Sequence, residues 1–363
     1  MTQENEPGLR LNRRDALIGL AAVTGVAAAG VGGVAVASDW LGPPRLTASR
    51  FADRFEQLYG RHDGFRRNHA KGVAAAGTFA SSGAGSEVSK ASVFAGGTSP
   101  VIARFSLSGS LPDVADDPAI VRGLGVMFQL RDGQQWRSAM VNIPVFPVST
   151  PQAFFEQLLA AKPDPATKKP DPAAMAAFLA AHPESAAAMK IIKAAPPTAG
   201  FADSTFRSLN AFLATDGNGR TTPIRWSLVP RQPADPPGPG GNAHDRLFDA
   251  LVEQAGRGPL SWRLVLTVGA PGDPTHDATL PWPADRRTID AGVLTIDHLL
   301  TEAPGNARDI NFDPTVLPDG LAVSDDPLPR ARSAVYAQSF NRRAREPKSP
   351  SEINVEQVIH DEH

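Results

Sequence analysis

The stretch Asp326-Pro-Leu-Pro-Arg-Ala-Arg332-Ser-Ala-Val-Tyr336-Ala-Gln-Ser-Phe-Asn-Arg-Arg343 lies near the end of a 363-residue chain that has only two tyrosines. We expect it to form one helix. Residues four apart share a helix face, so the guanidinium of Arg332 is placed beside the phenol oxygen of Tyr336. A cation there favours the phenolate, which is a good ligand for ferric iron. Taken alone the signal is weak, because Arg and Tyr fall four apart on many surface helices.

The composition limits the kinds of site that the chain can build. The chain has no cysteine, which excludes disulfides, thiolate-ligated haem, iron–sulfur clusters and zinc fingers. A metal would therefore be bound by His, Tyr, Met or carboxylate side chains. The net charge of -2 and a pI near 6.5 give no electrostatic signal for nucleic acid or an acidic membrane surface. Small or neutral partners are expected.

The N-terminal residues have the layout of an export signal. Arg13-Arg14 precede an uncharged run from Ala16 to Ser38, which contains the small-x-small site Ala35-Val-Ala37. This pattern predicts a twin-arginine signal peptide over residues 1–37 and a periplasmic or exported protein. The alternative is an uncleaved membrane anchor, since about 20 apolar residues can span a bilayer. The twin-arginine export machinery carries folded proteins, which hints at a cofactor inserted before export.

Residues 38–345 are predicted to form one α+β domain, because short β-type runs separated by Gly, Pro and Asp turns alternate with helical patterns. Strands are expected at 101–107, 123–130, 139–148, 208–213, 223–229, 261–268 and 292–296. Helices are expected at 46–61, from 150, over 171–195 with a break at Pro183, at 245–254 and at 326–343. Closely spaced short strands indicate a barrel or a sandwich. Residues 346–363 are expected to be a charged, loosely packed tail.

His69 is the histidine whose setting points to chemistry. Arg66, Arg67 and Lys71 flank it, and these cations disfavour the imidazolium, so His69 should be neutral near pH 7 and available as a base. The guanidinium forks of Arg66 and Arg104 match the carboxylates of a cofactor. Each of these residues has a plainer alternative from context alone, as a surface histidine or a surface ion pair. No metal-binding pair of histidines, hydrolase elbow or phosphate loop is present.

Six blocks of the sequence, in order, resemble the catalase family. The first resembles the R-x-x-H-A-K-G segment, the next three its V-R-F-S, R-G and N-x-P-x-F-F motifs, and the last two its F-D-P stretch and the helix carrying its tyrosine. The blocks are Phe65 to Gly72, Ala103 to Ser106, Arg122-Gly123, Asn142 to Phe146, Asn311 to Gly320, and Ser324 to Arg343. They span roughly residues 50–345, and the chain is similar to the short, exported catalase-related peroxidases.

The resemblance implies an antiparallel β-barrel with surrounding helices and a haem b buried between the barrel and the C-terminal helix. Tyr336 would be the axial iron ligand, Arg332 would keep it ionised, and Asp326 would support Arg332. On the opposite, distal side the family's roles fall on His69 as acid–base, Ser106 as its orienting hydroxyl and Asn142 as the catalytic amide. The remaining haem contacts would be propionate binding by Arg66, Arg104 and Arg343, and packing by Phe154.

The chain departs from the family pattern at three places. Catalases have two successive Asn before Thr-Pro, whereas this chain has Val141-Asn142 before Ile143-Pro144. Counting back from Pro144 puts Val141 where the catalytic Asn would fall, so the distal amide is in doubt. The Asp-Thr after the family's tyrosine appears as Gln338-Ser339, and a histidine that contacts the proximal arginine appears as Ser227.

The function implied by the resemblance is peroxidase activity. Hydrogen peroxide or an organic hydroperoxide would be reduced while a small organic reductant is oxidised, with weak or absent catalase activity. One alternative is a haem enzyme of the same scaffold that rearranges fatty-acid hydroperoxides. Another is a non-catalytic periplasmic haem-binding protein. A homo-oligomer is compatible with the sequence.

Overall fold

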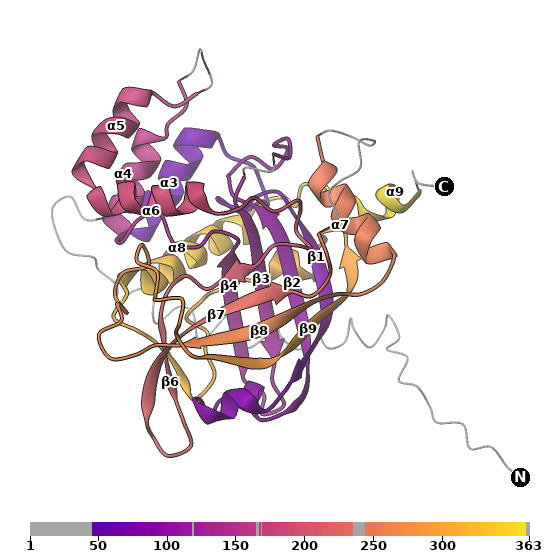
Figure 1. The fold of residues 1–363 in the computed structure, drawn as a ribbon. Helices are drawn as coiled ribbons and strands as arrows, with labels where there is room; N and C mark the ends of the chain where they lie inside the picture. The colour runs from indigo at the N-terminus through magenta and orange to yellow at the C-terminus, as the bar shows by residue number, and fades with distance from the viewer. Residues whose placement is uncertain (1–45, 118–119, 165–166, 168, 235–243, 361–363) are drawn as a thin grey trace, which may run out of the picture.

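A computed structural model describes residues 46–117, 120–164, 167, 169–234 and 244–360. The predicted export signal lies outside these residues. The described part is an antiparallel β-barrel with helices packed on its outside, as the sequence predicts (Figure 1). None of its helices is both long and apolar enough to cross a membrane.

Every strand pairing in the sheet is antiparallel. The strands are β1 Gly72–Ser81, β2 Gly97–Leu107, β3 Arg122–Gln129, β4 Gln135–Val141, β5 Phe206–Arg207, β6 Phe212–Thr215, β7 Thr221–Pro230, β8 Leu260–Val268, β9 Thr288–Leu300 and β10 Leu321–Val323. Eight of them follow one another in the order β7-β5-β4-β3-β2-β1-β9-β8, and β7 pairs again with β8. That last pairing closes the ring, so these strands have no free edge. β6 and β10 extend the sheet from β7.

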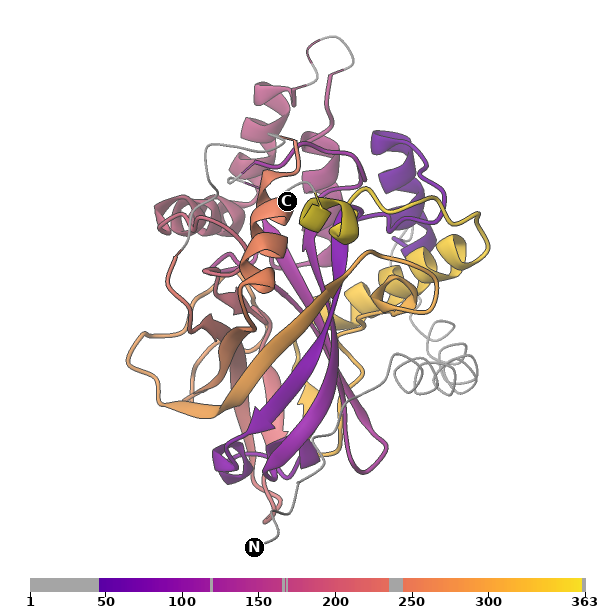
Figure 2. The same cartoon turned by 90° about the vertical axis from the view of Figure 1, so that its right-hand side faces the viewer.

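The helices gather mainly at one end and along one side of the barrel. They are α3 Ala48–Tyr59, α4 Pro151–Ala160, α5 Pro172–Ala181, α6 Pro183–Ala194, α7 Arg246–Gly256, α8 Pro327–Ala344 and α9 Val355–His360, with short 3₁₀ turns at Ala84–Glu87, Ser92–Phe94 and Ala307–Asp309. Thr150, Asp171 and Asp326 cap α4, α5 and α8, each with Pro at the next position. Figure 2 shows α3 beside α8, and α7 beside α9.

The alternation of side chains along β1 to β4 decides where a ligand can bind. Val73, Phe105, Leu124 and Met140 are buried in the core that fills the barrel, together with Trp136, Trp226, Trp262 and many phenylalanines. Their strand neighbours Gly72, Ser106, Gly123 and Val141 form a row across the same four strands. Successive residues in a strand point to opposite faces. This row therefore lies on the outer face of the barrel, and space for a ligand is found there.

Three predictions about the elements are wrong. The run 208–213 is not one strand, because β5 ends at Arg207 and β6 begins only at Phe212. The run 139–148 is not one strand: β4 ends at Val141, and the prolines at 144 and 147, which lack an N–H for the ladder, lie in the irregular segment that follows. The C-terminal residues are also not a loosely packed tail. Ile353 and Val355 are only 2% and 5% exposed within the core cluster, and α9 packs on α7. Their apolar side chains outweigh the charged character of the segment.

Candidate active site

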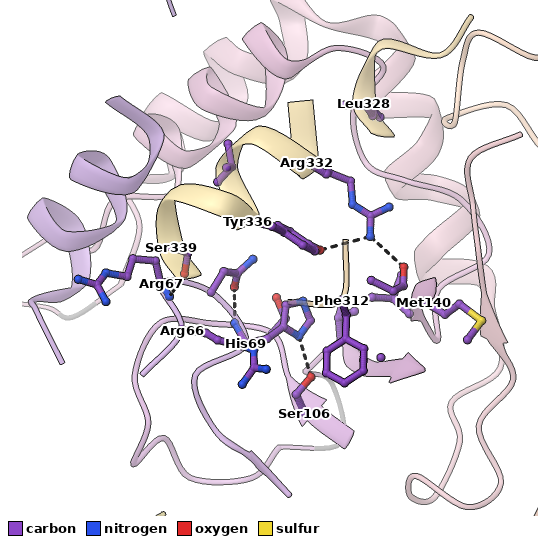
Figure 3. A pocket seen from close by; sticks show the side chains of 18 of the residues that line it. Arg66, Arg67, His69, Ser106, Met140, Phe312, Leu328, Arg332, Tyr336 and Ser339 are labelled. Atoms are coloured by element: carbon purple, nitrogen blue, oxygen red, sulfur yellow. Dashed lines mark hydrogen bonds between the residues drawn. The ribbon is translucent and has the colours of Figure 1, made fainter. Parts of the chain in front are cut away.

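A cavity of about 330 Å³ lies between the outer face of β2 to β4 and the helices α3, α4 and α8. Eight of the nine residues predicted from sequence to form the site line it. These are Arg66, His69, Arg104, Ser106, Phe154, Arg332, Tyr336 and Arg343. Segments far apart in the sequence thus converge on one site (Figure 3).

Tyr336 and Arg332 project from α8 into the cavity (Figure 3). Arg332 Nη2 donates hydrogen bonds to Tyr336 Oη at 3.3 Å and to the carbonyl of Ala139 at 2.8 Å. The second bond links the helix to strand β4. The predicted adjacency of the two side chains on one helix face is present, and the guanidinium is held where it can stabilise a phenolate.

Asp326 supports Arg332 through an intermediate residue that the sequence analysis did not identify. Arg332 Nη1 donates to Asn210 Oδ1 at 2.8 Å, and Asn210 Nδ2 donates to Asp326 Oδ2 at 2.8 Å. Asp326 Oδ1 accepts from the N–H of Leu328 and caps α8. The expected support of Arg332 by Asp326 is therefore indirect and runs through Asn210. Asn210, not Ser227, is the neighbour of the arginine, and nothing in the local sequence pattern marks it.

His69 comes from the loop before β1, opposite α8. Its Nδ1 lies 3.1 Å from Ser106 Oγ. When Nδ1 carries the proton and donates to Ser106, Nε2 is left as a proton acceptor. Burial first, and then the positive charges of Arg104, Arg332 and Arg66, lower the pKa of His69 from 6.5 to about 3. The imidazole is thus neutral near pH 7, as predicted.

The backbone around His69 is unusual and is held by specific contacts. The φ of His69 is 58°, in the left-handed region that residues other than Gly rarely adopt. Asn68 Oδ1 accepts from the N–H of His69 at 3.0 Å, and Arg104 Nη1 donates to the His69 carbonyl at 2.8 Å. Ser339 Oγ on α8 accepts from the N–H of Arg67 at 3.2 Å. These bonds fix the loop against the barrel on one side and α8 on the other.

Two glycines on β3 make room for neighbouring side chains on the barrel wall. A Cβ on Gly123 would lie 2.9 Å from His69 Cε1 and 3.0 Å from Ser106 Oγ, so the imidazole rests directly on the backbone of β3. A Cβ on Gly125 would lie 2.8 Å from Phe312 Cγ. The positions of His69 and Phe312 therefore depend on glycine at these two places.

Three arginines and one buried glutamate form a cluster at the cavity. Glu302 accepts from Arg104 through both oxygens at 2.8 Å and from Arg66 at 3.3 Å. Arg66 and Arg343 also donate to carbonyls of residues 307–310. Burial would raise the pKa of Glu302, but the three arginines outweigh it and the pKa is lowered. Glu302 was not predicted, because it follows β9 in a stretch without a motif.

The cluster carries excess positive charge. Three guanidinium groups and one carboxylate leave a formal balance of +2. Burial lowers the pKa of Arg343 to about 10, which still leaves it charged at pH 7. For Arg66, burial and then the charges of Arg104 and Arg343 lower the pKa well below its usual value. The site therefore favours a bound group with carboxylates of its own.

Asn142 does not line the cavity, which corrects the prediction that it supplies the distal amide. Its Oδ1 accepts from the N–H of Arg122 at 2.9 Å, and its own N–H donates to the Arg122 carbonyl. Val141 lines the cavity in its place, paired with Gly123 across the sheet. The alternation along β4 accounts for this, since neighbouring residues of a strand point to opposite faces.

Aromatic side chains form the outer part of the cavity. Phe154 lies with its ring centroid 6.1 Å from that of Phe51 and 5.9 Å from that of Phe146. Phe55 completes this lining from α3. Among the described residues, no group of three His, Asp or Glu side chains could hold a metal ion.

Comparisons with known proteins identify the family of this chain. The Catalase family description matches residues 42–234. The chain is 33% identical to a catalase-related peroxidase of Synechococcus elongatus, over 92% of this chain and 98% of that protein. It is 30% identical to a catalase-related peroxidase of Mycolicibacterium paratuberculosis, over 82% and 95% of the two chains.

The fold is shared with longer solved structures. A bacterial catalase superposes with a TM-score of 0.66 at 20% identity, covering 84% of this chain and 63% of that one. A fungal catalase gives a TM-score of 0.68 at 20% identity, covering 81% and 62%. This chain thus spans less than two thirds of the length of these catalases. A match over nearly the full length of two catalase-related peroxidases, on the catalase fold, shows that the chain belongs to the catalase family.

Proposed function

We propose that the protein is a haem-dependent peroxidase that reduces hydrogen peroxide or organic hydroperoxides while oxidising small organic reductants. The observation that carries the proposal is the placement of a neutral His69, oriented by Ser106, in the same cavity as the Arg332–Tyr336 pair. The first pair can move a proton on the substrate. The second can hold and tune an iron centre.

The residues of the cavity fit a haem group. Tyr336 offers a phenol oxygen backed by a cation, which suits ferric iron. The formal balance of +2 at Arg66, Arg104, Arg343 and Glu302 matches two propionates. Gly123 and Gly125 leave room on the barrel wall for the side chains of His69 and Phe312, which line the cavity. When bound, haem supplies the redox centre that accepts oxidising equivalents from peroxide and passes them to the reductant.

The proton chemistry belongs to His69. Its Nε2 can take the proton from one oxygen of hydrogen peroxide and return it to the other oxygen as the O–O bond breaks, which releases water. Ser106 holds the ring at Nδ1, and in the tautomer in which Nδ1 donates to Ser106, Nε2 is free to accept a proton. The organic reductant supplies the two electrons, and with two protons the balance is one peroxide converted to two waters.

The cavity favours peroxidase over catalase turnover. In catalase turnover a second peroxide must be held in place while it gives up two electrons. The position that would carry the catalytic amide holds Val141, and Asn142 faces the backbone of Arg122. The aromatic lining formed by Phe51, Phe146 and Phe154 is better suited to an organic reductant than to peroxide.

A paired assay on the haem-loaded protein tests this proposal. Peroxide-driven oxidation of an aromatic reductant and oxygen release from peroxide alone are measured under the same conditions, with His69→Ala and the exposed-residue control His276→Ala. We expect reductant oxidation to exceed oxygen release and to fall about 10²-fold or more in His69→Ala. Full activity of His69→Ala would refute the role of His69. Dominant oxygen release would refute the peroxidase assignment.

The N-terminal pattern bears on where in the cell the protein is located. We propose that the protein is exported by the twin-arginine route, because Arg13-Arg14 precede a weakly hydrophobic run. Replacing both arginines with lysine should leave the protein inside the cytoplasm in a cell-fractionation experiment. Unchanged export of that variant would argue for another route, and a full-length protein in the membrane fraction would favour the anchor.

A further inference from the structure

Asn68 lies next to His69 and lines the cavity, and it has no role in the function proposed so far. Its Oδ1 accepts two backbone hydrogen bonds, from the N–H of His69 at 3.0 Å and from the N–H of Gly109 at 2.9 Å. Both partners are donors. They fix which end of the amide is oxygen, because an NH₂ group could not accept from either of them.

The other end of the amide is consequently a free donor. Within the described part of the chain, Asn68 Nδ2 forms no hydrogen bond, and this atom is not buried away from solvent. It therefore faces open space, and the open space that Asn68 lines is the cavity. An amide N–H₂ is thus held beside the imidazole by two bonds to its oxygen.

The same two bonds tie Asn68 to the strained peptide of His69. With φ at 58°, His69 depends on its surroundings to hold its backbone. The Asn68 oxygen holds the N–H of this residue, and Arg104 holds its carbonyl. The amide and the imidazole therefore belong to adjacent residues whose backbone is held by the same hydrogen bonds.

We propose that Asn68 supplies the distal hydrogen-bond donor for peroxide in place of the amide that Val141 lacks. His69 Nε2 accepts the peroxide proton, and Asn68 Nδ2 donates to the oxygen that becomes negative as the proton leaves. This inference rests on the proposed peroxidase function and names a further residue of the same site. A donor placed where charge develops accelerates such a step.

Two substitutions separate the donor role from the structural role. Asn68→Asp keeps oxygen acceptors for the N–H groups of His69 and Gly109 but removes the NH₂ donor. Asn68→Ala removes both. The double variant Asn68→Ala with Val141→Asn returns an amide from β4, because Val141 pairs with Gly123, on which the His69 ring rests. Asn218→Ala, in an exposed turn, is the matched control.

Two quantities are measured on each haem-loaded variant: the second-order rate constant for reaction with peroxide, and the dissociation constant for cyanide, a second ligand that accepts distal hydrogen bonds. We expect both single variants to have a rate constant about 5–10-fold lower and a cyanide dissociation constant about 5–10-fold higher than wild type, and the double variant to recover most of the loss. Thermal unfolding of each variant shows that it is folded.

Wild-type values in Asn68→Asp, or a double variant no better than Asn68→Ala, would overturn the donor role and leave only a structural one. Failure of the proposed function gives a different result. In that case the wild-type protein itself would not react with peroxide, whereas the cyanide measurements would still report on the donor.

Discussion

Asn210 Oδ1 accepts a hydrogen bond of 2.8 Å from Arg332 Nη1, so a neutral amide is the immediate neighbour of the arginine that contacts Tyr336. The negative charge lies one residue further away, on Asp326, which accepts from Asn210 Nδ2. Among the described residues, Arg332 contacts the phenol oxygen, an amide oxygen and a backbone carbonyl but forms no ion pair with a carboxylate.

Replacing Asn210 with Ala should break this relay at its centre. It removes one hydrogen-bond partner from Arg332 and one from the buried Asp326, at a cost of about 1–3 kcal/mol in the free energy of unfolding. Haem should also be lost more readily, because Arg332 is then held only by its bonds to Ala139 and Tyr336. Denaturant unfolding and haem transfer to an excess of an acceptor protein measure the two effects. Unchanged haem loss beside reduced stability would show that Asn210 only supports the fold. Asn218→Ala should change stability by less than about 0.5 kcal/mol.

The low pKa of His69 predicts how stability depends on pH. The folded protein keeps His69 neutral down to about pH 3, whereas the unfolded chain takes up a proton near pH 6.5. Between these values the unfolded state binds more protons, so stability falls as the pH falls from 6.5 towards 3. His69→Gln removes this contribution. As the pH falls from 6.5 towards 3, the unfolding free energy of the wild type should therefore decrease relative to that of His69→Gln. A difference that stays constant with pH would contradict the buried, neutral state.

Gly123→Ala should impair the distal side without removing the cofactor site. The added methyl would lie 2.9 Å from His69 Cε1 and 3.0 Å from Ser106 Oγ, which forces the imidazole to move. A small misplacement of a catalytic group costs about 10²-fold in rate. Gly217→Ala, whose added methyl meets no atom within 4 Å, is the matched control. Equal peroxide reaction rates in the two variants would show that the ring does not depend on the glycine.

Glu302→Gln tests the charge balance of the arginine cluster. Without the carboxylate, Arg66 and Arg104 lose their ion-pair partner, and the protein without haem should be destabilised by about 3–5 kcal/mol. Because two propionates would restore negative charge, added haem should raise the melting temperature more in this variant than in the wild type. A smaller rise in the variant would show that the cluster does not bind the carboxylates.

Features that depend on residues close together in the sequence could be predicted. The spacing of Arg332 and Tyr336 needs only one regular helix. The neutrality of His69 is predicted from the cations of its own loop, but burial, Arg104 and Arg332 lower its pKa more than Arg66 does, and Arg67 and Lys71 are not among the causes. Closely spaced strands and turns predict a barrel or a sandwich, and only the family resemblance selects the barrel; the exact ends of the strands are not predicted. The predicted strand 139–148 ends at Val141, and the prolines at 144 and 147 lie in the irregular segment that follows. The C-terminal segment packs on the core through the apolar Ile353 and Val355, although it is rich in charged residues.

The residues that the sequence did not reveal act through long-range contacts. Asn210 and Glu302 are far in sequence from the arginines that they bind, and neither sits in a motif. The position of Asn142 shows a second limit. A shift of one residue along the chain places the Asn142 amide against the backbone of Arg122 instead of in the cavity. Counting residues from a motif therefore predicts which side chain enters the cavity only where the face of the strand is also known.

The central claim is that His69 drives a fast reaction of peroxide at a haem held by Tyr336. The most direct test is rapid mixing of the haem-loaded protein with one equivalent of hydrogen peroxide while the absorption spectrum is recorded, for wild type and His69→Ala. We predict that both proteins have the same absorption maxima before mixing, and that the spectral change is at least about 10²-fold slower in His69→Ala. Equally fast changes in the two proteins, or no spectral change in the wild type, would contradict the claim.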